Sequence, residues 1–260
     1  MAEAIQSCFA RRETKYFLTR KQYDGMLAGM AAHTAPDVYP RYTINNIYFD
    51  TDNYRLIRDS LEKPVYKEKL RLRSYGQVGD GQTVFLEMKK KLDGMVYKRR
   101  IVLPIEEAEA YLARGERPTD DSQILREIDW LRRCYDLKPA AFIGYEREAY
   151  AGVEDEELRI TFDTNLRWRS TDLDLRSKDR GEVLGPPDAI LMEVKFPGVC
   201  PFWLSRLMSE LGVKRTSFSK YGTCYVDHLM TPPTAPQPHP ATASAALRPH
   251  ALSAALFAVR

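Results

Sequence analysis

Apolar and charged side chains alternate along residues 66–103, and this alternation is the clearest structural pattern in the chain. The segment reads YKEKLRLRSYG, then a short loop that contains glycine, then VFLEMKKKLDGMVYKRRIVL. Because successive side chains of a β-strand point to opposite faces, the leucines of the first run share one face and its cations share the other. The cationic face of this run carries Lys67, Lys69, Arg71 and Arg73.

Two turns divide this segment into three predicted antiparallel strands. The loop from Gly76 to Gly81 is typical of a hairpin connection, and Asp93-Gly94 of a tight turn. Leucines behind and cations in front indicate a half-buried sheet with one cationic surface. One face of the second run carries Phe85, Glu87 and Lys89, and one face of the third carries Lys98 and Arg100.

The rest of the pattern predicts five further strands. They are Phe9–Leu18, Tyr42–Asp50, Ala141–Ala149, Leu158–Asp163 (extended or followed by Asn165–Arg169) and Asp188–Phe196. Together with the three charged strands this gives eight, which is enough to close into a barrel that holds a ligand. The predicted fold class is α+β, an antiparallel eight-stranded β-barrel with helices packed outside.

Helical spacing and end signals predict the elements between these strands. The helices are Tyr23–Ala32 after a capping box at Thr19, a short helix or turn at Asn53–Leu61, Pro104–Arg114, a helix from Asp121 or Ser122 to Leu137, and Pro201–Leu211 before Gly212. Residues 1–230 are predicted to form one domain. From Thr231 the chain becomes rich in Pro and Ala, which predicts a disordered tail over residues 231–260.

Composition excludes several classes of protein. No apolar run is long enough to cross a bilayer, and the N-terminus lacks the apolar core of a signal peptide. The four cysteines are scattered without a CxxC pair, which argues against a disulfide frame or structural zinc and predicts a cytoplasmic location. None of the four histidines stands in the charged strands, so histidine-based catalysis has little support.

Motif searches leave only the charged strands as candidate chemistry. The chain contains no GxxxxGK[ST], no GxGxxG after a strand, no HExxH and no GxSxG. Seven strand segments instead offer charged or polar residues at close, same-face spacing, which a solvated outer face alone explains poorly. They are Glu13 with Lys15, Lys69 with Arg71 and Arg73, Glu87 with Lys89, Lys98 with Arg100, Tyr145 with Arg147, Arg159 with Asp163, and Glu193 with Lys195.

These residue types suit phosphoryl transfer. The net charge of the chain is only +3, yet cations heavily outnumber carboxylates in the charged strands. Arg and Lys neutralise non-bridging phosphate oxygens, and a barrel lined with them is a polyanion site. A carboxylate such as Glu193 or Glu87 can hold Mg²⁺ or Mn²⁺ against the phosphates. The alternative for each Glu is an ion pair with a neighbouring Lys or Arg.

Nine short motifs in order resemble the VTC domain, the catalytic domain of the vacuolar transporter chaperone polyphosphate polymerase. The motifs are ETKYFL, NNIYFDT, KLRLRSYG, VFLEMKKK, YKRR, YERxAY, LRITFDT, LMEVKF and FSKY. The resemblance spans about Phe9 to His228 and places the chain in the triphosphate tunnel metalloenzyme, or CYTH-like, superfamily. It implies an antiparallel β-tunnel that binds the phosphates of ATP and a growing polyphosphate chain.

The resemblance also implies roles for individual residues. The expected catalytic set is Lys15, Arg71, Arg73, Lys89, Lys98, Arg147, Glu193 and Lys220. Further phosphate contacts are expected from Lys69, Tyr145, Arg159, Lys195 and Ser219. Glu193 and Glu87 are the expected ligands of a Mn²⁺ or Mg²⁺ cofactor. The wider superfamily often opens with ExExK, but Arg11 stands at the first position here and leaves Glu13 and Lys15.

Three functions remain open from the sequence. The first is a polymerase that transfers the γ-phosphate of ATP to polyphosphate and releases ADP. The second is a metal-dependent tunnel triphosphatase that uses water as the acceptor. The third is a non-catalytic polyphosphate-binding module. The expected partners are ATP and inorganic polyphosphate, whereas nucleic acid is not expected because the charge is predicted to face inward.

Overall fold

The protein is described by a computed structural model that covers residues 11–93 and 95–230, with the side chain of Arg11 left out. Its strands are β1 (Arg11–Leu18), β2 (Thr34–Asp50), β3 (Tyr66–Tyr75), β4 (Thr83–Leu92), β5 (Met95–Pro104), β6 (Lys138–Gly152), β7 (Arg159–Arg169), β8 (Glu182–Val183), β9 (Ile190–Pro197) and β10 (Arg215–Thr216). Its helices are α1 (Arg20–Met30), α2 (Arg55–Leu61), α3 (Ile105–Arg114), α4 (Gln123–Cys134), α5 (Phe202–Glu210) and α6 (Lys220–Cys224), followed by a π-helical turn, η1 (Tyr225–Leu229). The predicted tail lies outside the described residues, so it stays a prediction.

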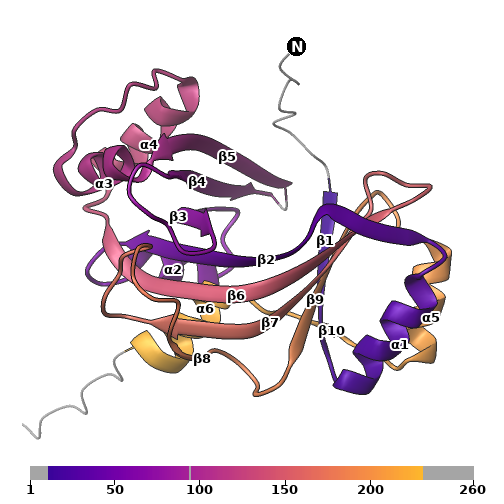
Figure 1. Ribbon diagram of the computed structural model, residues 1–260. Helices are drawn as coiled ribbons and strands as arrows, with labels where there is room; N and C mark the ends of the chain where they lie inside the picture. Colours follow the sequence, from indigo (N-terminus) through magenta and orange to yellow (C-terminus); the bar gives the residue numbers. More distant parts are fainter. Residues whose placement is uncertain (1–10, 94, 231–260) are drawn as a thin grey trace, which may run out of the picture. The chain divides into compact units, whose positions relative to one another are not determined.

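All the strands belong to one antiparallel sheet (Figure 1). The strand order is β10-β1-β9-β7-β6-β2-β3-β4-β5, with β8 paired to β7. Eight of these strands are long, as the sequence predicts, and β8 and β10 contain two residues each. The predicted antiparallel tunnel fold with helices outside is confirmed. Within the described residues, the hydrogen-bonded ladder has β10 and β5 as its two ends.

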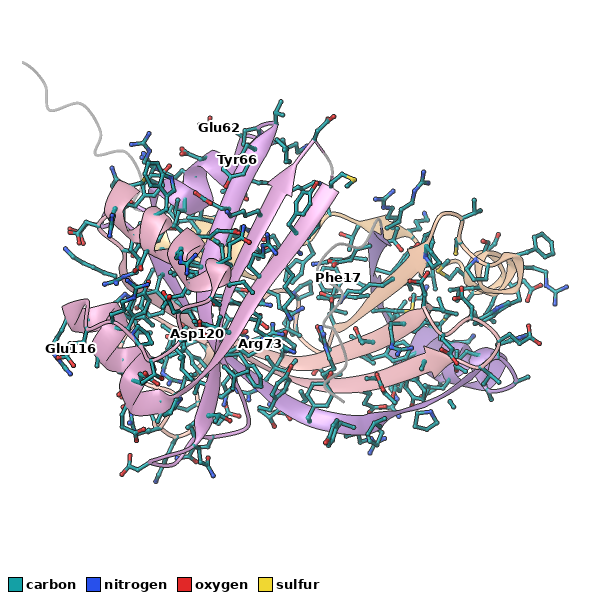
Figure 2. The ribbon with its side chains drawn as sticks, turned by 90° about the horizontal axis from the view of Figure 1, so that it is seen from above. Phe17, Glu62, Tyr66, Arg73, Glu116 and Asp120 are labelled. Carbon is teal, nitrogen blue, oxygen red and sulfur yellow. The ribbon has the colours of Figure 1, made fainter. Side chains whose placement is uncertain are left out.

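Two hydrophobic cores lie on the outer side of the sheet. Helices α3 and α4 pack against the leucine faces of β3, β4 and β5, and α1 and α5 pack against β1, β7 and β9. Figure 2 shows the first helix pair covering one side of the charged strands. Because both helical layers cover outer faces, the cationic faces of the strands are left to line the interior.

The third core fixes the C-terminal helices across the strands. The buried Asp50 carboxylate accepts hydrogen bonds from the backbone N–H groups of Leu56 and Ile57 and from the Tyr221 hydroxyl, at 2.8, 3.0 and 3.0 Å. Tyr221 also stacks on Tyr48 with ring centroids 4.6 Å apart. These contacts hold α6 against α2 and β2, and α6 carries Ser219 and Lys220 at its start.

Local signals explain most element ends. The predicted capping box at Thr19 is present, with Gln22 as its reciprocal partner, and helix α1 starts at Arg20 rather than at Tyr23. Ser122 caps α4, which ends at Cys134 rather than at Leu137 because β6 already begins at Lys138. Within the described part of the chain, no helix is long and apolar enough to cross a membrane.

Candidate functional site

A first group of charges, the Glu193 cluster, lies on the inner face of β1, β6, β7 and β9 beside α6. It consists of Glu193, Asp163, Lys15, Arg147 and Lys220. The Arg147 guanidinium donates to both oxygens of Asp163, at 2.6 and 2.7 Å, and to Glu193 Oε2 at 3.1 Å. The Lys220 ammonium donates to Asp163 at 2.6 Å and to Glu193 Oε1 at 3.0 Å. Lys15 Nζ lies 3.3 Å from the same Glu193 oxygen.

Strand register assembles this cluster. Lys15 on β1 stands opposite Glu193 on β9, and Arg147 on β6 stands opposite Asp163 on β7. Opposite residues of an antiparallel pair lie on the same face with short Cβ–Cβ distances, so the partners meet although they are far apart in sequence. Lys220 completes the cluster from the first turn of α6.

A second group, the Glu87 cluster, lies on β3, β4 and β5 and consists of Glu87, Arg71, Arg73, Lys98 and Arg100. Arg71 donates to Glu87 Oε2 at 2.6 Å, and Lys98 Nζ lies 2.7 Å from Oε1. The Arg73 and Arg100 nitrogens are farther from the Glu87 carboxylate, at 3.7 and 3.8 Å. One carboxylate, 1% exposed, therefore neutralises a group of four cations only in part.

Neutral side chains orient the arginines of the second cluster. Arg73 donates to Asn46 Oδ1 at 2.9 Å and to the Tyr145 hydroxyl at 3.4 Å. Arg71 donates to the Tyr48 hydroxyl at 3.2 Å. The Tyr145 ring also lies 4.4 Å from Lys220 Nζ, so Tyr145 connects the two clusters. The predicted residues Lys15, Arg71, Arg73, Lys98, Tyr145, Arg147, Glu193 and Lys220 are thus brought together on the inner face.

The electrostatics of the carboxylates follow from this pairing. Burial raises the pKa of Glu193, but Lys220, Lys15 and Arg147 outweigh burial and hold this pKa well below its usual range. The pKa of Glu87 is lowered in the same way, by Arg71, Arg73 and Lys98 against the effect of burial. Both residues are therefore carboxylates at neutral pH.

Two lysines of the inner face, Lys98 and Lys69, have lowered pKa values because burial and neighbouring cations both disfavour their charged forms. Burial and the adjacent Arg73 lower the pKa of Lys98 to about 8, although Glu87 opposes this shift. Burial and the neighbouring Lys89, Lys67 and Lys15 lower the pKa of Lys69 to about 7. In both lysines burial is the largest cause, and the neighbouring positive charges add to it.

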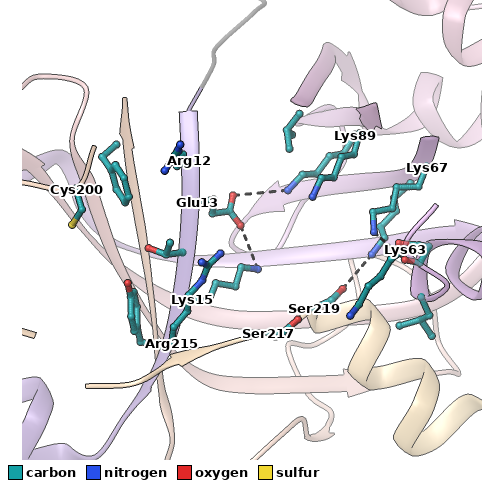
Figure 3. A pocket seen from close by; sticks show the side chains of 18 of the residues that line it. Arg12, Glu13, Lys15, Lys63, Lys67, Lys89, Cys200, Arg215, Ser217 and Ser219 are labelled. Carbon is teal, nitrogen blue, oxygen red and sulfur yellow. Dashed lines mark hydrogen bonds and ion pairs between the residues drawn. The ribbon is translucent and has the colours of Figure 1, made fainter. Parts of the chain in front are cut away.

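Three further predicted residues, Lys69, Lys89 and Ser219, line a cavity of about 960 Å³ (Figure 3). Lys69 donates to the Ser219 hydroxyl at 3.1 Å, and Lys89 Nζ lies 3.9 Å from Glu13. Both lysines, Ser219, Glu13 and Lys15 line the cavity. Lys195 stands opposite Glu13 on the neighbouring strand, and burial lowers its pKa although Glu13 and Glu193 oppose this.

Arg159 is a predicted phosphate contact that the structure brings neither into a cluster nor to the lining of this cavity. Its guanidinium donates to the backbone carbonyls of Glu156 and Leu158, at 2.8 and 3.3 Å, and lies 3.6 Å from Asp37. Arg159 is the first residue of β7, so its long side chain reaches the loop before the strand. Its role in phosphate binding stays a prediction.

Several residues of the site were not chosen from the sequence. Asp163 was noted only as a neighbour of Arg159, although its place on the same face of a predicted strand was a usable signal. Glu13 was considered only as the remaining acidic residue of an ExExK motif, yet it lines the cavity. Asn46 and Tyr48 alternate with apolar residues in NNIYF, which places both on the inner face.

The donor set permits a divalent cation only together with substrate oxygens. The described residues contain no group of three or more His, Cys, Asp or Glu side chains placed to hold a metal. The Lys15 ammonium does lie between two carboxylates, 3.4 Å from Glu13 and 3.3 Å from Glu193. The Glu13 and Glu193 carboxylates thus already share one positive charge, that of Lys15. Mg²⁺ is commonly held by one or two carboxylates plus substrate phosphates, so Glu193 and Glu13 fit such a site, whereas Glu87 is enclosed by four cations.

Comparisons with known proteins identify relatives of this chain. The sequence profile of the VTC domain matches residues 10–227. The vacuolar transporter chaperone complex subunit 4 of Schizosaccharomyces pombe is 25% identical over 272 residues, which cover 85% of this chain and 37% of that protein. The subunit of the same name from Trypanosoma brucei brucei is 25% identical over 211 residues, covering 64% and 27%. The chain thus spans about a third of the length of these relatives.

A solved structure resembles the fold. It is a putative adenylyl cyclase from Hippeastrum, described as having a dominant triphosphatase activity. The two structures align with a TM-score of 0.52 at 15% identity, over 84% of this chain and 96% of that one. At this identity the likeness extends to the tunnel fold alone.

Proposed function

Because the chain belongs to the VTC domain family, we propose that it is a polyphosphate polymerase that transfers the γ-phosphate of ATP to a growing polyphosphate chain and releases ADP. The observation that carries this proposal is the pair of clusters on the inner face. Their arginines and lysines outnumber the carboxylates and point into the same interior. Such an interior neutralises two phosphate chains at once, which is the main demand of phosphoryl transfer.

The step itself needs no covalent bond to the protein. A terminal oxygen of the acceptor chain attacks the γ-phosphorus, the bond from this phosphorus to the β,γ-bridging oxygen breaks, and ADP leaves with the electron pair. Arg147 and Lys220 bind oxygens near Glu193, while Arg71, Arg73 and Lys98 bind oxygens near Glu87. This arrangement holds the donor and acceptor chains in line. The two reactants then need not meet in the correct orientation by diffusion, which lowers the entropic part of the barrier.

A Mn²⁺ or Mg²⁺ ion would be held by Glu193, with Glu13 beside it. When bound, the ion would neutralise negative charge on the substrate phosphates. Glu87 is better assigned to orienting Arg71 and Lys98, because cations surround its carboxylate.

A phosphate acceptor is favoured over water by the state of the carboxylates. Water must lose a proton to attack, and a carboxylate accepts a proton better when its pKa lies near the working pH. The pKa values of Glu193 and Glu87 are instead held low by Lys220 and Arg71 among other cations. A terminal phosphate is already an anion near neutral pH, so it needs no such base.

Two other functions remain as alternatives within this proposal. The likeness to the Hippeastrum protein keeps a metal-dependent triphosphatase open. A polyphosphate-binding module without turnover also fits the cationic interior. We further propose that the domain works on cytoplasmic ATP, and that partner subunits like those named in the relatives' complex supply functions beyond this domain.

Product identity tests the function. Pure protein with γ-labelled ATP, Mn²⁺ and a short polyphosphate primer is expected to yield ADP and a ladder of lengthening chains that an exopolyphosphatase removes. Stoichiometric orthophosphate without a ladder would establish the triphosphatase. No turnover with Mn²⁺ or Mg²⁺, together with retained polyphosphate binding, would establish the binding module.

Arg71→Gln is expected to weaken tripolyphosphate binding by about tenfold or more. A charge-assisted hydrogen bond contributes about 1.5–3 kcal/mol, and about 1.4 kcal/mol corresponds to tenfold. The matched control is Arg99→Gln, because Arg99 lies on the outer face of β5, 3.1 Å from Glu127. Calorimetric titration of both variants makes the comparison. Equal affinities for the two variants would remove Arg71 from the site.

A further inference from the structure

Lysines stand directly opposite lysines where the first half of β3 pairs with the last half of β4. The register pairs Lys67 with Lys91 and Lys69 with Lys89. We call these four residues the lysine ladder. Like charges directly opposite each other on one face of an antiparallel pair destabilise the sheet. The fold therefore keeps two unfavourable pairs in succession at one end of the same hairpin.

Few carboxylates neutralise this ladder. Among the described residues, Lys67, Lys69 and Lys91 have no Asp or Glu oxygen within the 4.0 Å of an ion pair, and Lys89 has only Glu13, at 3.9 Å. Lys67 instead donates to the backbone carbonyl of Ser60 at 2.9 Å. The contrast with the two clusters is clear, because there every carboxylate is shared by several cations.

The ladder opens onto the cavity of about 960 Å³ described above. Eight cationic side chains and two carboxylates line this cavity of about 960 Å³. The cations besides the ladder are Arg12, Lys15, Lys63 and Arg215, and the carboxylates are Glu13 and Glu68. Figure 3 shows Lys63, Lys67 and Lys89 pointing into the same space from the side opposite Arg12. Burial and like neighbours lower the pKa of Lys69 to about 7, which reflects the same crowding.

We propose that the Lys67–Lys91 end of the lysine ladder, with Lys63, is an anion subsite that binds the acceptor polyphosphate chain beyond the phosphates held by the two clusters and by Lys69 and Lys89. This inference rests on the proposed function for the identity of the anion. The ladder is unfavourable without a ligand, and a polyanion along it turns each like-charge pair into a pair of charge-assisted contacts.

The position of the ladder makes it selective for chain length. Lys67 precedes Arg71 by four residues on the same strand, which is about 13 Å at ~3.3 Å per residue. That span exceeds the length of three linked phosphates. A triphosphate held by Arg71 and Lys98 therefore does not reach Lys67 and Lys91, whereas a long chain does. The subsite retains long products and leaves the binding of ATP unaffected.

The test is the double variant Lys67→Gln/Lys91→Gln, which removes one like-charge pair. Calorimetric titration is made with long-chain polyphosphate and with tripolyphosphate. The affinity for long chains is expected to fall by about tenfold or more, and the affinity for tripolyphosphate to stay within about twofold. The melting temperature without ligand is expected not to fall, because a repulsion is removed. The control is Lys21→Gln/Lys178→Gln, which makes the same change in net charge at two exposed lysines outside the cavity.

Three outcomes overturn the subsite. Unchanged long-chain affinity means that the ladder does not contact the polymer. An equal fall for both ligands means that the inner clusters were disturbed, and an equal fall in the control means that only net charge matters. If the double variant fails to fold, Lys91→Gln alone is measured, with an intermediate loss expected for long chains only. A wild-type protein that binds long chains in this way but makes no polymer contradicts the polymerase and leaves the subsite standing.

Discussion

Glu193→Gln is expected to lower metal-dependent turnover by about two orders of magnitude or more while polyphosphate binding is kept. Glutamine preserves the size of the side chain but removes the charge that a divalent cation requires. The loss of one electrostatic contact to a transition state commonly costs about 10²–10³ in kcat. Binding of polyphosphate without metal is expected to stay equal or to tighten. The reason is that a charged Glu193 carboxylate no longer competes with phosphate oxygens for Lys15, Arg147 and Lys220.

The control separates a metal ligand from an ion-pair partner. Glu127→Gln removes a carboxylate that pairs with Lys90 at 2.9 Å and with Arg99 at 3.1 Å on the outer side of the sheet. This variant is expected to keep its metal-dependent rate and its metal affinity. The measurements are turnover across a titration of Mn²⁺ and a melting curve for each variant. If Glu193→Gln lowers only the melting temperature, Glu193 is a structural partner of Lys220 and Arg147.

The sequence predicted those parts of the fold that depend on local pattern. The strands β3, β4 and β5 follow from their alternation of leucine with Lys or Arg, and the turns between them follow from glycine. The start of β2 was missed: the strand begins at Thr34, not at Tyr42. Two prolines and several exposed residues lie in this first part, and the register shifts between Pro36 and Arg41. An interrupted, exposed edge carries no alternation to detect.

For most of the candidate site residues, alternation predicted the face of the strand but not the partner across it. Alternation places Arg147 and Glu193 on inner faces, yet only the register between strands brings Arg147 to both Asp163 and Glu193. Register depends on bulges such as the one between Gly144 and Glu146 on β6, which local pattern does not reveal. The position of Lys220 could not be predicted from strand pattern or register at all, because it depends on how Asp50 and Tyr221 hold α6 against the sheet.

Asp163 is expected to be the most sensitive position of the site for stability. Its side chain is 0% exposed and accepts from both Arg147 and Lys220. Removing one member of a buried ion pair typically costs about 3–5 kcal/mol, because the remaining charge stays buried without its partner. Asp163→Asn keeps the shape of the side chain and removes the charge. For a domain of this size, a loss of about 3 kcal/mol lowers Tm by roughly 6–12 °C.

A ligand test shows whether Asp163 only supports the fold or also positions Arg147 and Lys220. Polyphosphate supplies oxygens to both cations, so saturating polyphosphate is expected to restore most of the lost Tm in Asp163→Asn. Turnover is expected to stay low even then, with kcat reduced more than KM, because Arg147 and Lys220 bind phosphate without the orientation that Asp163 gives them. Asp163→Glu restores the charge and is expected to recover stability before activity, since the longer side chain displaces the guanidinium. A variant with normal kcat at saturating polyphosphate would show that Asp163 acts on folding alone.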